Sequence, residues 1–429
     1  MGSNSQLFGR EKLKEIFRRH WEVFKTKYSR YRAKVYEEVV QKMLGCGDPK
    51  NGYALYVCER CGKDRKKVPF SCKSSFCLSC GKVYTDQWAG RIEGILFRGV
   101  AYRHTVLTVP DEVRIYFYRD MRLLAKLMRV GVECLDDVLS TVLRRRVKGG
   151  YIVVLQTNGR SGSHNPHLHI IMTSGGISGN KEGEDCWVNL KYLPYEILHK
   201  KWQHHLLELL KEQVGTREIR GKIDELYRKY PNGLVANVQR GEVPKRIKEL
   251  AKYLAKYVVS PPISVSRIIN YDGERVKYWY KDHRSGKRKI EEIDVYKFIG
   301  RMVQHILPKG MQRIRYYGLH GTAVYEKIRK KLMTILPTNG GQDKETFTVT
   351  EMSYRKRVIK TNGQDPFICT RCGGELILWR IWHPKYGVIY DEEERLKTGY
   401  NERDKRGRDQ DVGDIRHPVL QLSMPGLRV

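Results

Sequence analysis

Two runs of apolar and β-branched residues in the middle of the chain predict a buried β-hairpin. The first run is YIVVLQT (151–157) and the second is HLHIIMT (167–173), with a loop rich in Gly, Ser and Asn between them. Such runs, bounded by turn-forming residues, are typical of strands that are largely buried. Side chains alternate along a strand, so His167 and His169 share one face of the second strand. A turn in the middle of the loop would place Gln156 opposite His167.

Helical periodicity and turn residues organise the rest of the chain. Residues 8–42 carry a basic amphipathic pattern that predicts a helix packed against the cysteine-rich segment that follows. The later elements are predicted as a helical insertion at 192–230, a helix between Pro244 and Pro261, a hairpin with an Asp-Gly turn at 268–282, a helix at 294–307 and a strand at 311–318.

The charge of the chain points to a polyanionic partner. The 429 residues include 81 Lys and Arg against 48 Asp and Glu, a formal net charge of +33. Such an excess repels itself unless a polyanion relieves it, so nucleic acid is the first partner to expect and an anionic membrane surface the second. No apolar run of about 18 residues and no signal sequence is present, so we expect a soluble intracellular protein and no membrane partner.

Six of the ten cysteines lie within residues 46–80 and predict a zinc site. Two C-x2-C pairs separated by 15 residues match the spacing of a four-thiolate zinc ribbon, and a disulfide framework fits a reducing compartment less well. The expected Zn²⁺ ligands are Cys58, Cys61, Cys77 and Cys80. The sequence leaves the role of Cys46 and Cys72 open: they are either buried thiols or ligands of a second ion. A closed four-sulfur site would be structural.

The histidine pair predicts a second kind of metal site. Two neutral imidazoles in a buried sheet are costly unless something receives their lone pairs, and a divalent ion does so. His167, His169 and the carboxamide oxygen of Gln156 would form a partly open site that suits Mg²⁺ or Mn²⁺ together with phosphate oxygens. A hydrogen-bonded core pair is the alternative. His104 could orient a ligand or serve as a structural histidine.

Two tyrosines in the stretch AKYLAKYV (251–258) complete the candidate chemistry. Tyr253 and Tyr257 are four positions apart, so their phenols project from one face of a helix beside Lys252 and Lys256. Such pairs commonly pack in helix cores. Beside a metal that polarises a phosphodiester, however, a tyrosine could attack the phosphorus and retain the 5′ side of the cut strand as a phosphotyrosine ester.

These motifs together resemble the HUH-type rolling-circle transposases with two tyrosines, of the insertion sequence 91 family, which are related to Helitrons. The resemblance covers roughly residues 15–330. It rests on the stretches SCKSSFCLSC, YRHTVLTVP, QTNGRSGSHNPHLHIIMTSGG, YLAKYV and HILPKGMQRIRYYG. It implies an α+β fold in which a nuclease domain with a central antiparallel sheet flanked by helices follows a helical segment and a zinc-ribbon-like domain. It also implies cleavage of single-stranded DNA at the ends of a mobile element and strand transfer to a target.

The resemblance also assigns roles to residues and divides the chain. His167 and His169 match the metal-binding motif of the family, Tyr253 and Tyr257 match its nucleophiles, and Gln156 fits a third ligand. The expected divisions are a helical segment at 1–42, a zinc-binding domain at 43–90, a nuclease domain at 91–335 with a helical insertion at about 190–232, and a linker with a charged C-terminal region at 336–429.

The expected partners are single-stranded transposon ends and target DNA in a bacterial or archaeal nucleoid. Arg313 and Arg315 share a strand face and could clamp a phosphate, or they could simply be solvated. No phosphate-binding loop is present, so a host helicase or the replication machinery should supply single strands. The sequence leaves open a metal role for Cys369 and Cys372, the recognised DNA sequence, the order of the tyrosines, and the oligomeric state, for which a monomer is compatible. Rival functions are a plasmid replication initiator, a relaxase, or a non-catalytic zinc-ribbon regulator of DNA.

Overall fold

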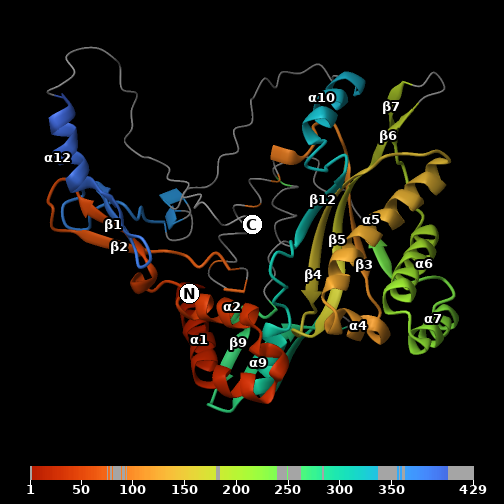
Figure 1. The fold of residues 1–429 in the computed structure, drawn as a ribbon, viewed down its shortest axis with the longest axis horizontal. Coiled ribbons are helices and arrows are strands. Elements are labelled where there is room, and N and C mark those ends of the chain that lie inside the picture. Colours follow the sequence, from red (N-terminus) through yellow and green to blue (C-terminus); the bar gives the residue numbers. More distant parts are fainter. Residues whose placement is uncertain are drawn as a thin grey trace. The chain divides into compact units, whose positions relative to one another are not determined.

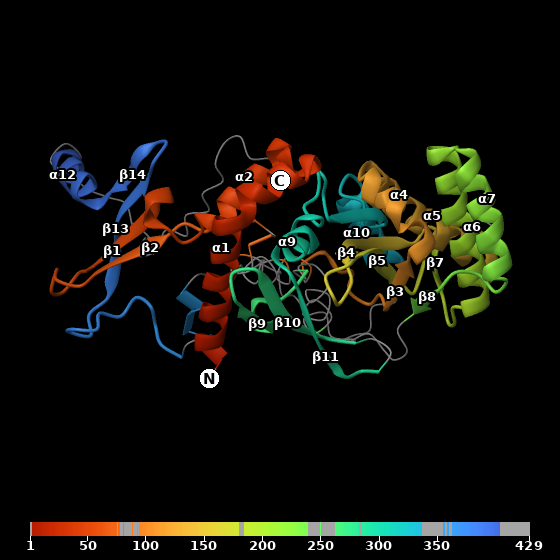
Figure 2. The ribbon, with the colours of Figure 1, turned by 90° about the horizontal axis from the view of Figure 1, so that it is seen from below.

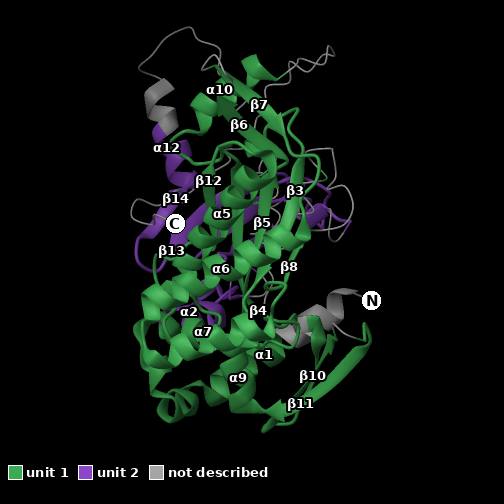
Figure 3. Ribbon diagram, turned by 90° about the vertical axis from the view of Figure 1, so that its right-hand side faces the viewer, with its two compact units in different colours: residues 1–37, 81–350 green, residues 38–80, 351–429 purple. Residues whose placement is uncertain are grey.

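The computed structural model divides the chain into two compact units (Figure 3). The larger unit contains residues 1–37 and 81–350, and the smaller contains residues 38–80 and 351–429. The segments expected as a zinc domain and as a separate C-terminal region therefore contribute to one unit. The structure describes residues 2–403 apart from 75, 78–79, 81–87, 89–91, 93, 180–183, 239–248, 250–261, 283–284, 337–354, 357 and 360–362.

A five-stranded antiparallel sheet with the order β12-β4-β5-β3-β8 forms the centre of the larger unit (Figure 1). Its strands are β3 (Tyr102–Thr108), β4 (Gly150–Asn158), β5 (His164–Thr173), β8 (Ala236–Val238) and β12 (Ile314–Gly318). The predicted central hairpin is β4 and β5, and the strand predicted at 311–318 is β12. The α+β fold with a central antiparallel sheet is thus confirmed.

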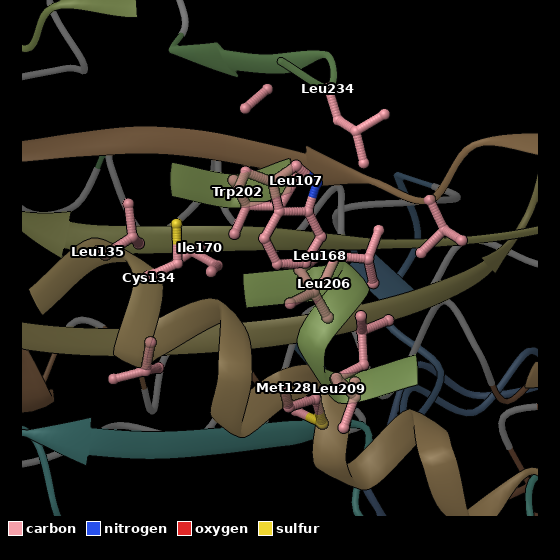
Figure 4. Packing of buried hydrophobic residues seen from close by; sticks show 14 of the residues in the cluster. Leu107, Met128, Cys134, Leu135, Leu168, Ile170, Trp202, Leu206, Leu209 and Leu234 are labelled. Carbon is pink, nitrogen blue, oxygen red and sulfur yellow. The ribbon is translucent and has the colours of Figure 1, made fainter. Parts of the chain in front are cut away.

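Helices cover one face of this sheet and bury its apolar side chains. They are α4 (Arg114–Arg119), α5 (Arg122–Leu143), α6 (Tyr195–Val214) and α7 (Arg217–Lys229), of which α6 and α7 occupy the predicted helical insertion. Leu168 and Ile170 of β5 point into a cluster that also contains Leu135 of α5 and Trp202 of α6 (Figure 4). The Trp202 indole also donates a hydrogen bond to the carbonyl of Thr108 at 2.8 Å, which ties α6 to the end of β3.

Helix α5 approaches the sheet closely at Gly131. A Cβ atom built at this position would lie 2.5 Å from Cδ1 of Leu168 and 3.3 Å from Cδ1 of both Ile170 and Leu107. A side chain at this position would force the ends of these three side chains to shift, and a densely packed core leaves them little space to do so. This glycine therefore allows close packing of α5 on β5.

The opposite face of the sheet carries a smaller apolar cluster beside a polar area. Ile152 and Val154 of β4 and Ile171 of β5 pack there with Trp88 and Ile92. Gln156 and His169 lie on the same face of the sheet as Val154 and Ile171. The histidine face is therefore the face opposite to α5 and α6.

Smaller elements complete the larger unit (Figure 2). A three-stranded antiparallel sheet contains β9 (Ile268–Tyr271), β10 (Arg275–Lys281) and β11 (Arg288–Asp294), and it is followed by α9 (Val295–Val303), so the hairpin at 268–282 and the following helix are confirmed. The remaining elements are a ribbon of β6 (Gly175–Gly179) with β7 (Asp185–Asn189), and α10 (Tyr325–Ile335).

The N-terminal segment differs from the single predicted helix. It forms α1 (Gly2–Lys27), a 3-10 turn (Ser29–Arg32) and α2 (Lys34–Leu44). Helix α1 packs against α9 and β9, where His20 and the Tyr271 hydroxyl form a 2.6 Å hydrogen bond. Its buried aromatic residues, which include Trp21 and Phe24, find an apolar partner surface there. The expected packing of this segment on the cysteine-rich region remains a prediction for α1, whereas the end of α2 from residue 38 onward belongs to the same unit as the cysteines.

The smaller unit contains a four-stranded antiparallel sheet with the order β14-β13-β1-β2. Its strands are β1 (Tyr53–Cys58), β2 (Arg65–Pro69), β13 (Leu376–His383) and β14 (Gly387–Asp391), and α12 (Glu392–Arg403) follows. Strands from the two ends of the chain therefore lie side by side. In the part of the chain that the structure describes, no helix has the length and apolarity needed to cross a membrane.

We predict that the two helical glycines Gly131 and Gly221 respond to substitution with opposite signs. Gly131→Val overfills the α5–sheet contact and should lower the free energy of unfolding by about 1–3 kcal/mol. Gly221 lies in α7 with open space around its Cα. Gly221→Ala should therefore raise the free energy of unfolding by up to about 1 kcal/mol, because alanine has the higher helix propensity. Denaturant titration of both variants measures these changes. A Gly131→Val protein as stable as the parent would contradict the described packing.

Candidate functional site

The candidate site lies where β5 runs between β4 and β3. In the sheet, His167 pairs with Gln156 of β4 and with Thr108 of β3, which confirms the register expected for the hairpin. His169 lies two positions further along β5, opposite Val154. The two imidazole rings have centroids 5.0 Å apart and lie nearly edge to face. The strand alternation thus brings both histidines and Gln156 onto one face.

Hydrogen bonds at the Nδ1 atoms orient both imidazoles. Nδ1 of His167 donates to the carbonyl oxygen of Asn165 at 2.7 Å, because a carbonyl can only accept. This tautomer leaves the lone pair of His167 on Nε2. Nε2 of His169 lies 3.2 Å from Oε1 of Gln156, and its Nδ1 lies 2.9 Å from Nε2 of His104. Each ring is therefore held through Nδ1, with Nε2 as the atom available for a ligand.

His104 can serve His169 in either of two protonation arrangements. Without a metal, Nε2 of His169 donates to Gln156, and Nδ1 accepts a hydrogen bond from His104. With a metal on Nε2, the proton of His169 sits on Nδ1 and His104 accepts it. Metal-bound histidines commonly have such a partner for the second nitrogen, which fixes the ring and its tautomer. The rings of His104 and His169 also stack, with centroids 5.1 Å apart.

Burial keeps the two histidines of the motif uncharged. Desolvation lowers the pKa of His167 below its usual value, and desolvation together with the nearby His167 and His104 lowers the pKa of His169 well below it. Both lone pairs therefore remain available at neutral pH and below it, down to the lowered pKa values. A metal ligand must be unprotonated, so this environment favours metal binding.

The donor set fits a hexacoordinate divalent cation. Two neighbouring ligands of Mg²⁺ at metal–ligand distances near 2.1 Å are roughly 3 Å apart, and the His169 Nε2 to Gln156 Oε1 separation is 3.2 Å. Two nitrogens and one neutral oxygen leave coordination positions for water or phosphate oxygens. His167, His169 and Gln156 could therefore hold Mg²⁺ or Mn²⁺, as the sequence predicts.

The four predicted residues of the tyrosine helix lie outside the described residues. They are Lys252, Tyr253, Lys256 and Tyr257. The described residues on either side belong to the histidine domain. Val238 of β8 pairs with Thr105 in the central sheet, and Ile263 lies against Gly162 in the β4–β5 loop, where a Cβ built on the glycine would be 3.2 Å from its side chain.

The two arginines proposed as a phosphate clamp share a face, but it is not the histidine face. Arg315 of β12 pairs with Val153, whereas its neighbour Ile314 pairs with Val154 in the histidine phase. Arg313 is two positions before Arg315 and so is on the same side of the chain. It donates a hydrogen bond to the carbonyl of His305 at 3.1 Å. Any phosphate that these arginines bind is therefore separate from a phosphate at the histidines.

The structure divides the cysteines differently from the predicted ribbon. Two groups of four have all their sulfur atoms within 4.8 Å of one another, and both lie in the smaller unit. The first group is Cys46, Cys72, Cys77 and Cys80, and the second is Cys58, Cys61, Cys369 and Cys372. The predicted grouping of Cys58 and Cys61 with Cys77 and Cys80 is corrected, because β1 carries its knuckle to the C-terminal strands.

A sequence signal for this division exists. The knuckles of the second group read CERCG (58–62) and CTRCG (369–373), so both follow the pattern C-x-R-C-G, whereas the knuckle at Cys77 reads CLSCG. Backbone N–H groups of Lys63 and Asp64 lower the pKa of Cys61 to about 6, which favours the thiolate that a metal requires. The prediction from spacing grouped the two knuckles that are nearest in sequence and did not use the shared C-x-R-C-G pattern.

A group of basic and aromatic side chains lies on the three-stranded sheet. Trp279 of β10 has the guanidinium of Arg288 at 4.6 Å and that of Arg267 at 5.4 Å from its ring centroid. Its strand neighbours in the same phase are Lys277 and Lys281. Stacked arginine and tryptophan beside lysines suit both the bases and the phosphates of nucleic acid.

Comparison with known proteins identifies the class. A family model described as "Putative transposase" matches residues 150–327, and one described as "Transposase zinc-binding domain" matches residues 16–109. Similar proteins are the "Transposase for insertion sequence element IS801" of Pseudomonas savastanoi pv. phaseolicola and the "Putative transposase y4qJ" of Sinorhizobium fredii (strain NBRC 101917 / NGR234). The first is 27% identical over 353 residues, which are 79% of this chain and 82% of the relative. The second is 25% identical over 389 residues, which are 86% of this chain and 94% of the relative.

The fold and the matched regions define a transposase with a zinc-binding domain. The chain belongs to the insertion sequence 91 family of transposases, as its motifs indicate. The histidine motif and the tyrosine pair lie within the first matched region, and the cysteines from Cys46 to Cys80 lie within the second. No solved structure matches the chain significantly.

We predict that Mn²⁺ binds at the histidine face. His169→Ala should abolish measurable binding, and His104→Phe should weaken it by about 10–100-fold through loss of the Nδ1 partner. Because burial lowers the pKa of both histidines in the motif, binding should persist as the pH falls below 6.5 and be lost only when the imidazoles protonate. Electron paramagnetic resonance of free Mn²⁺ measures the bound fraction.

His204→Ala serves as the control, because His204 is exposed on α6. It should bind Mn²⁺ as the parent does. Equal affinity of the parent and His169→Ala would remove the histidine face as the cation site.

Proposed function

We propose that this transposase nicks single-stranded DNA at the ends of its element and transfers the strands through 5′-phosphotyrosine intermediates. The observation that carries the proposal is the histidine face, where two imidazoles held through Nδ1 and one carboxamide oxygen converge. Two neutral imidazole nitrogens and a carboxamide oxygen gathered on one sheet face are ligands that a divalent cation accepts. Such a donor set suits a phosphodiester that is to be polarised.

The proposed reaction exchanges one ester for another. The phenol oxygen of Tyr253 or Tyr257 loses its proton and forms a bond to the scissile phosphorus, and the bond from phosphorus to the 3′ oxygen breaks. The 3′ oxygen takes up a proton and leaves as a hydroxyl, while the 5′ phosphate remains on the tyrosine. A 3′ hydroxyl of another strand can reverse the step. The number of phosphate ester bonds stays constant, so no nucleotide hydrolysis is required.

The chain's own residues position the reacting phosphate. His167, His169 and Gln156 would hold Mg²⁺ or Mn²⁺, which supplies Lewis-acid polarisation of the phosphate. Asn165 and His104 hold the two ligand rings in place, and this rigidity limits the reorganisation needed during the reaction. The low pKa of both imidazoles keeps them in the ligating form at neutral pH.

The attachment of the flanking residues supports a role for the tyrosine pair at this face. The segment that contains Tyr253 and Tyr257 begins after Val238, which belongs to the central sheet, and ends before Ile263, which contacts the loop between β4 and β5. One attachment point pairs with β3, which carries His104, and the other contacts the loop between the two strands that carry the proposed ligands. Two nucleophiles would allow two successive exchanges, with one holding a cut end while the other attacks a second strand.

Basic and aromatic surfaces supply the proposed DNA contacts. The net charge of +33 favours a polyanion in general, and the arginine–tryptophan group around Trp279 can stack on an unpaired base. Lys252 and Lys256 are adjacent in sequence to the nucleophiles and are proposed to contact the scissile phosphate. Single strands would come from replication or a host helicase.

We predict a covalent protein–DNA adduct that depends on the tyrosines. The full chain is incubated with Mg²⁺ or Mn²⁺ and labelled single-stranded oligonucleotides from the element ends, and adducts are resolved under denaturing conditions. The double variant with Tyr253→Phe and Tyr257→Phe should form none, because a phenyl ring has no nucleophilic oxygen. Each single variant should lose one of two successive steps.

The control is Tyr192→Phe, which changes an exposed tyrosine and should leave the adduct unchanged. Cleavage by the double variant at the parental rate would show that the nucleophile lies elsewhere. A chain that binds duplex DNA and forms no adduct with any metal would instead be a zinc-ribbon regulator.

We also predict a steep salt dependence of binding to single-stranded DNA. If roughly six phosphates are neutralised, the affinity should fall about 300-fold for a fourfold increase in salt. Arg288→Gln should reduce the slope of the logarithmic plot by about 0.7, because it removes one phosphate contact. Arg122→Gln is the control, since Arg122 is already paired with Asp120. An affinity that is insensitive to salt would contradict the electrostatic account.

A further inference from the structure

The second cysteine group joins residues from the two ends of the chain. The sulfur atoms of Cys58 and Cys372 lie 3.5 Å apart, and those of Cys61 and Cys369 lie 3.8 Å apart. Cys58 is the last residue of β1 and Cys61 follows it, whereas Cys369 and Cys372 precede strand β13, which pairs with β1. The zinc-binding family match ends at residue 109, so it assigns nothing to the C-terminal pair.

The geometry of this group fits a tetrahedral zinc ion and not disulfides. With Zn–S bonds near 2.3 Å, the sulfur atoms of a tetrahedral site are about 3.8 Å apart. The two sulfur–sulfur separations given above, 3.5 and 3.8 Å, agree with this value. A disulfide would require sulfur atoms about 2.05 Å apart, and all four thiols are free.

The backbone forms the same turn at both knuckles. Gly62 has a φ of +64° and donates its N–H to the carbonyl of Cys58 at 2.9 Å. Gly373 has a φ of +71° and donates to the carbonyl of Cys369 at 3.1 Å. The N–H of Arg371 also donates to the sulfur of Cys369 at 3.4 Å. Two equivalent turns thus present four sulfur atoms to one point.

Gly374 shows that the two knuckles meet closely. A Cβ atom at this position would lie 2.8 Å from Cβ of Arg60, 3.3 Å from the sulfur of Cys58 and 3.4 Å from the sulfur of Cys372. Backbone approach of this kind excludes a side chain. Hydrogen bonds from the N–H and hydroxyl of Thr370 to the Asp64 carboxylate, at 3.0 and 3.3 Å, join the same two segments.

Among the described residues of the smaller unit, few apolar side chains are buried around this group. The local cluster of buried residues contains Phe367 and Leu376 together with two of the cysteines, Cys58 and Cys369. A domain with so few buried apolar residues usually depends on metal or disulfide cross-links for stability. Strand β1 ends at Cys58 and its partner β13 begins at Leu376, so a metal held by this group would cross-link the two paired strands of the sheet (Figure 2).

We propose that Cys58, Cys61, Cys369 and Cys372 bind a second Zn²⁺, separate from an ion at the first cysteine group, and that this ion ties the C-terminal strands to the N-terminal hairpin. Each thiol loses its proton when the metal binds, so binding releases protons and strengthens at higher pH. The site joins cysteines that are 314 and 308 positions apart, and the segment between them includes residues 81–350 of the larger unit. The proposal is independent of the nicking reaction.

The metal content of the full-length protein tests the proposal. The parent, purified without added metal and dialysed against a weak chelator, should contain two zinc ions per chain by inductively coupled plasma mass spectrometry. The double variant with Cys369→Ser and Cys372→Ser should contain one. The Cys186→Ser control, which changes a half-buried cysteine on β7, should retain two. One ion in the parent, or two in the double variant, would overturn the proposal.

A second measurement separates loss of the site from general misfolding. The Cys372→His variant keeps a zinc ligand, so it should retain two ions. After replacement by Co²⁺, its visible spectrum should shift from that of two four-sulfur sites to one four-sulfur and one three-sulfur, one-nitrogen site. A spectrum identical to that of the parent would show that Cys372 is not a ligand and would contradict the assignment.

Discussion

The pairing register of β5 with its two neighbours is the constraint on which the site depends. His167 lies opposite Gln156, and the next histidine lies opposite Val154. A slip by one residue would turn both imidazoles toward the apolar helices and bring Leu168 and Ile170 to the polar face. Burial of those two side chains under α5 and α6 therefore fixes the orientation of the metal ligands.

The two faces of the sheet thus have complementary roles. The helical face supplies the burial that holds β5 in place, and Gly131 allows α5 to approach closely enough for that packing. The other face carries polar groups that would be costly in an apolar core, and their hydrogen bonds with Asn165 and His104 orient them. Rigid packing on one side is therefore the physical basis for a preorganised donor set on the other.

The sequence predicts local features of this protein well. The alternation in YIVVLQT and HLHIIMT predicts the hairpin, its register and the shared face of the histidines, because strand period and turn position are local properties. The hairpin at 268–282 follows from its Asp-Gly turn in the same way.

Features that depend on long-range contacts are not predicted. The partner of the knuckle at Cys58 is about 310 residues away, and spacing rules cannot detect such a pairing. Likewise, the amphipathic pattern of α1 predicts an apolar face but not that α9 and β9 cover it. The tyrosine pair lies outside the described residues, so its place beside the histidines remains a prediction.

The central claim is that the phenols of Tyr253 and Tyr257 and the imidazoles of the histidine motif surround one divalent cation. A direct test places 3-fluorotyrosine at each of the two positions in turn and records the fluorine resonance while Mn²⁺ is added. The account predicts strong paramagnetic broadening of both resonances, and none when His169 is replaced by alanine. Fluorine lines that stay sharp in the parent at saturating Mn²⁺ would contradict it.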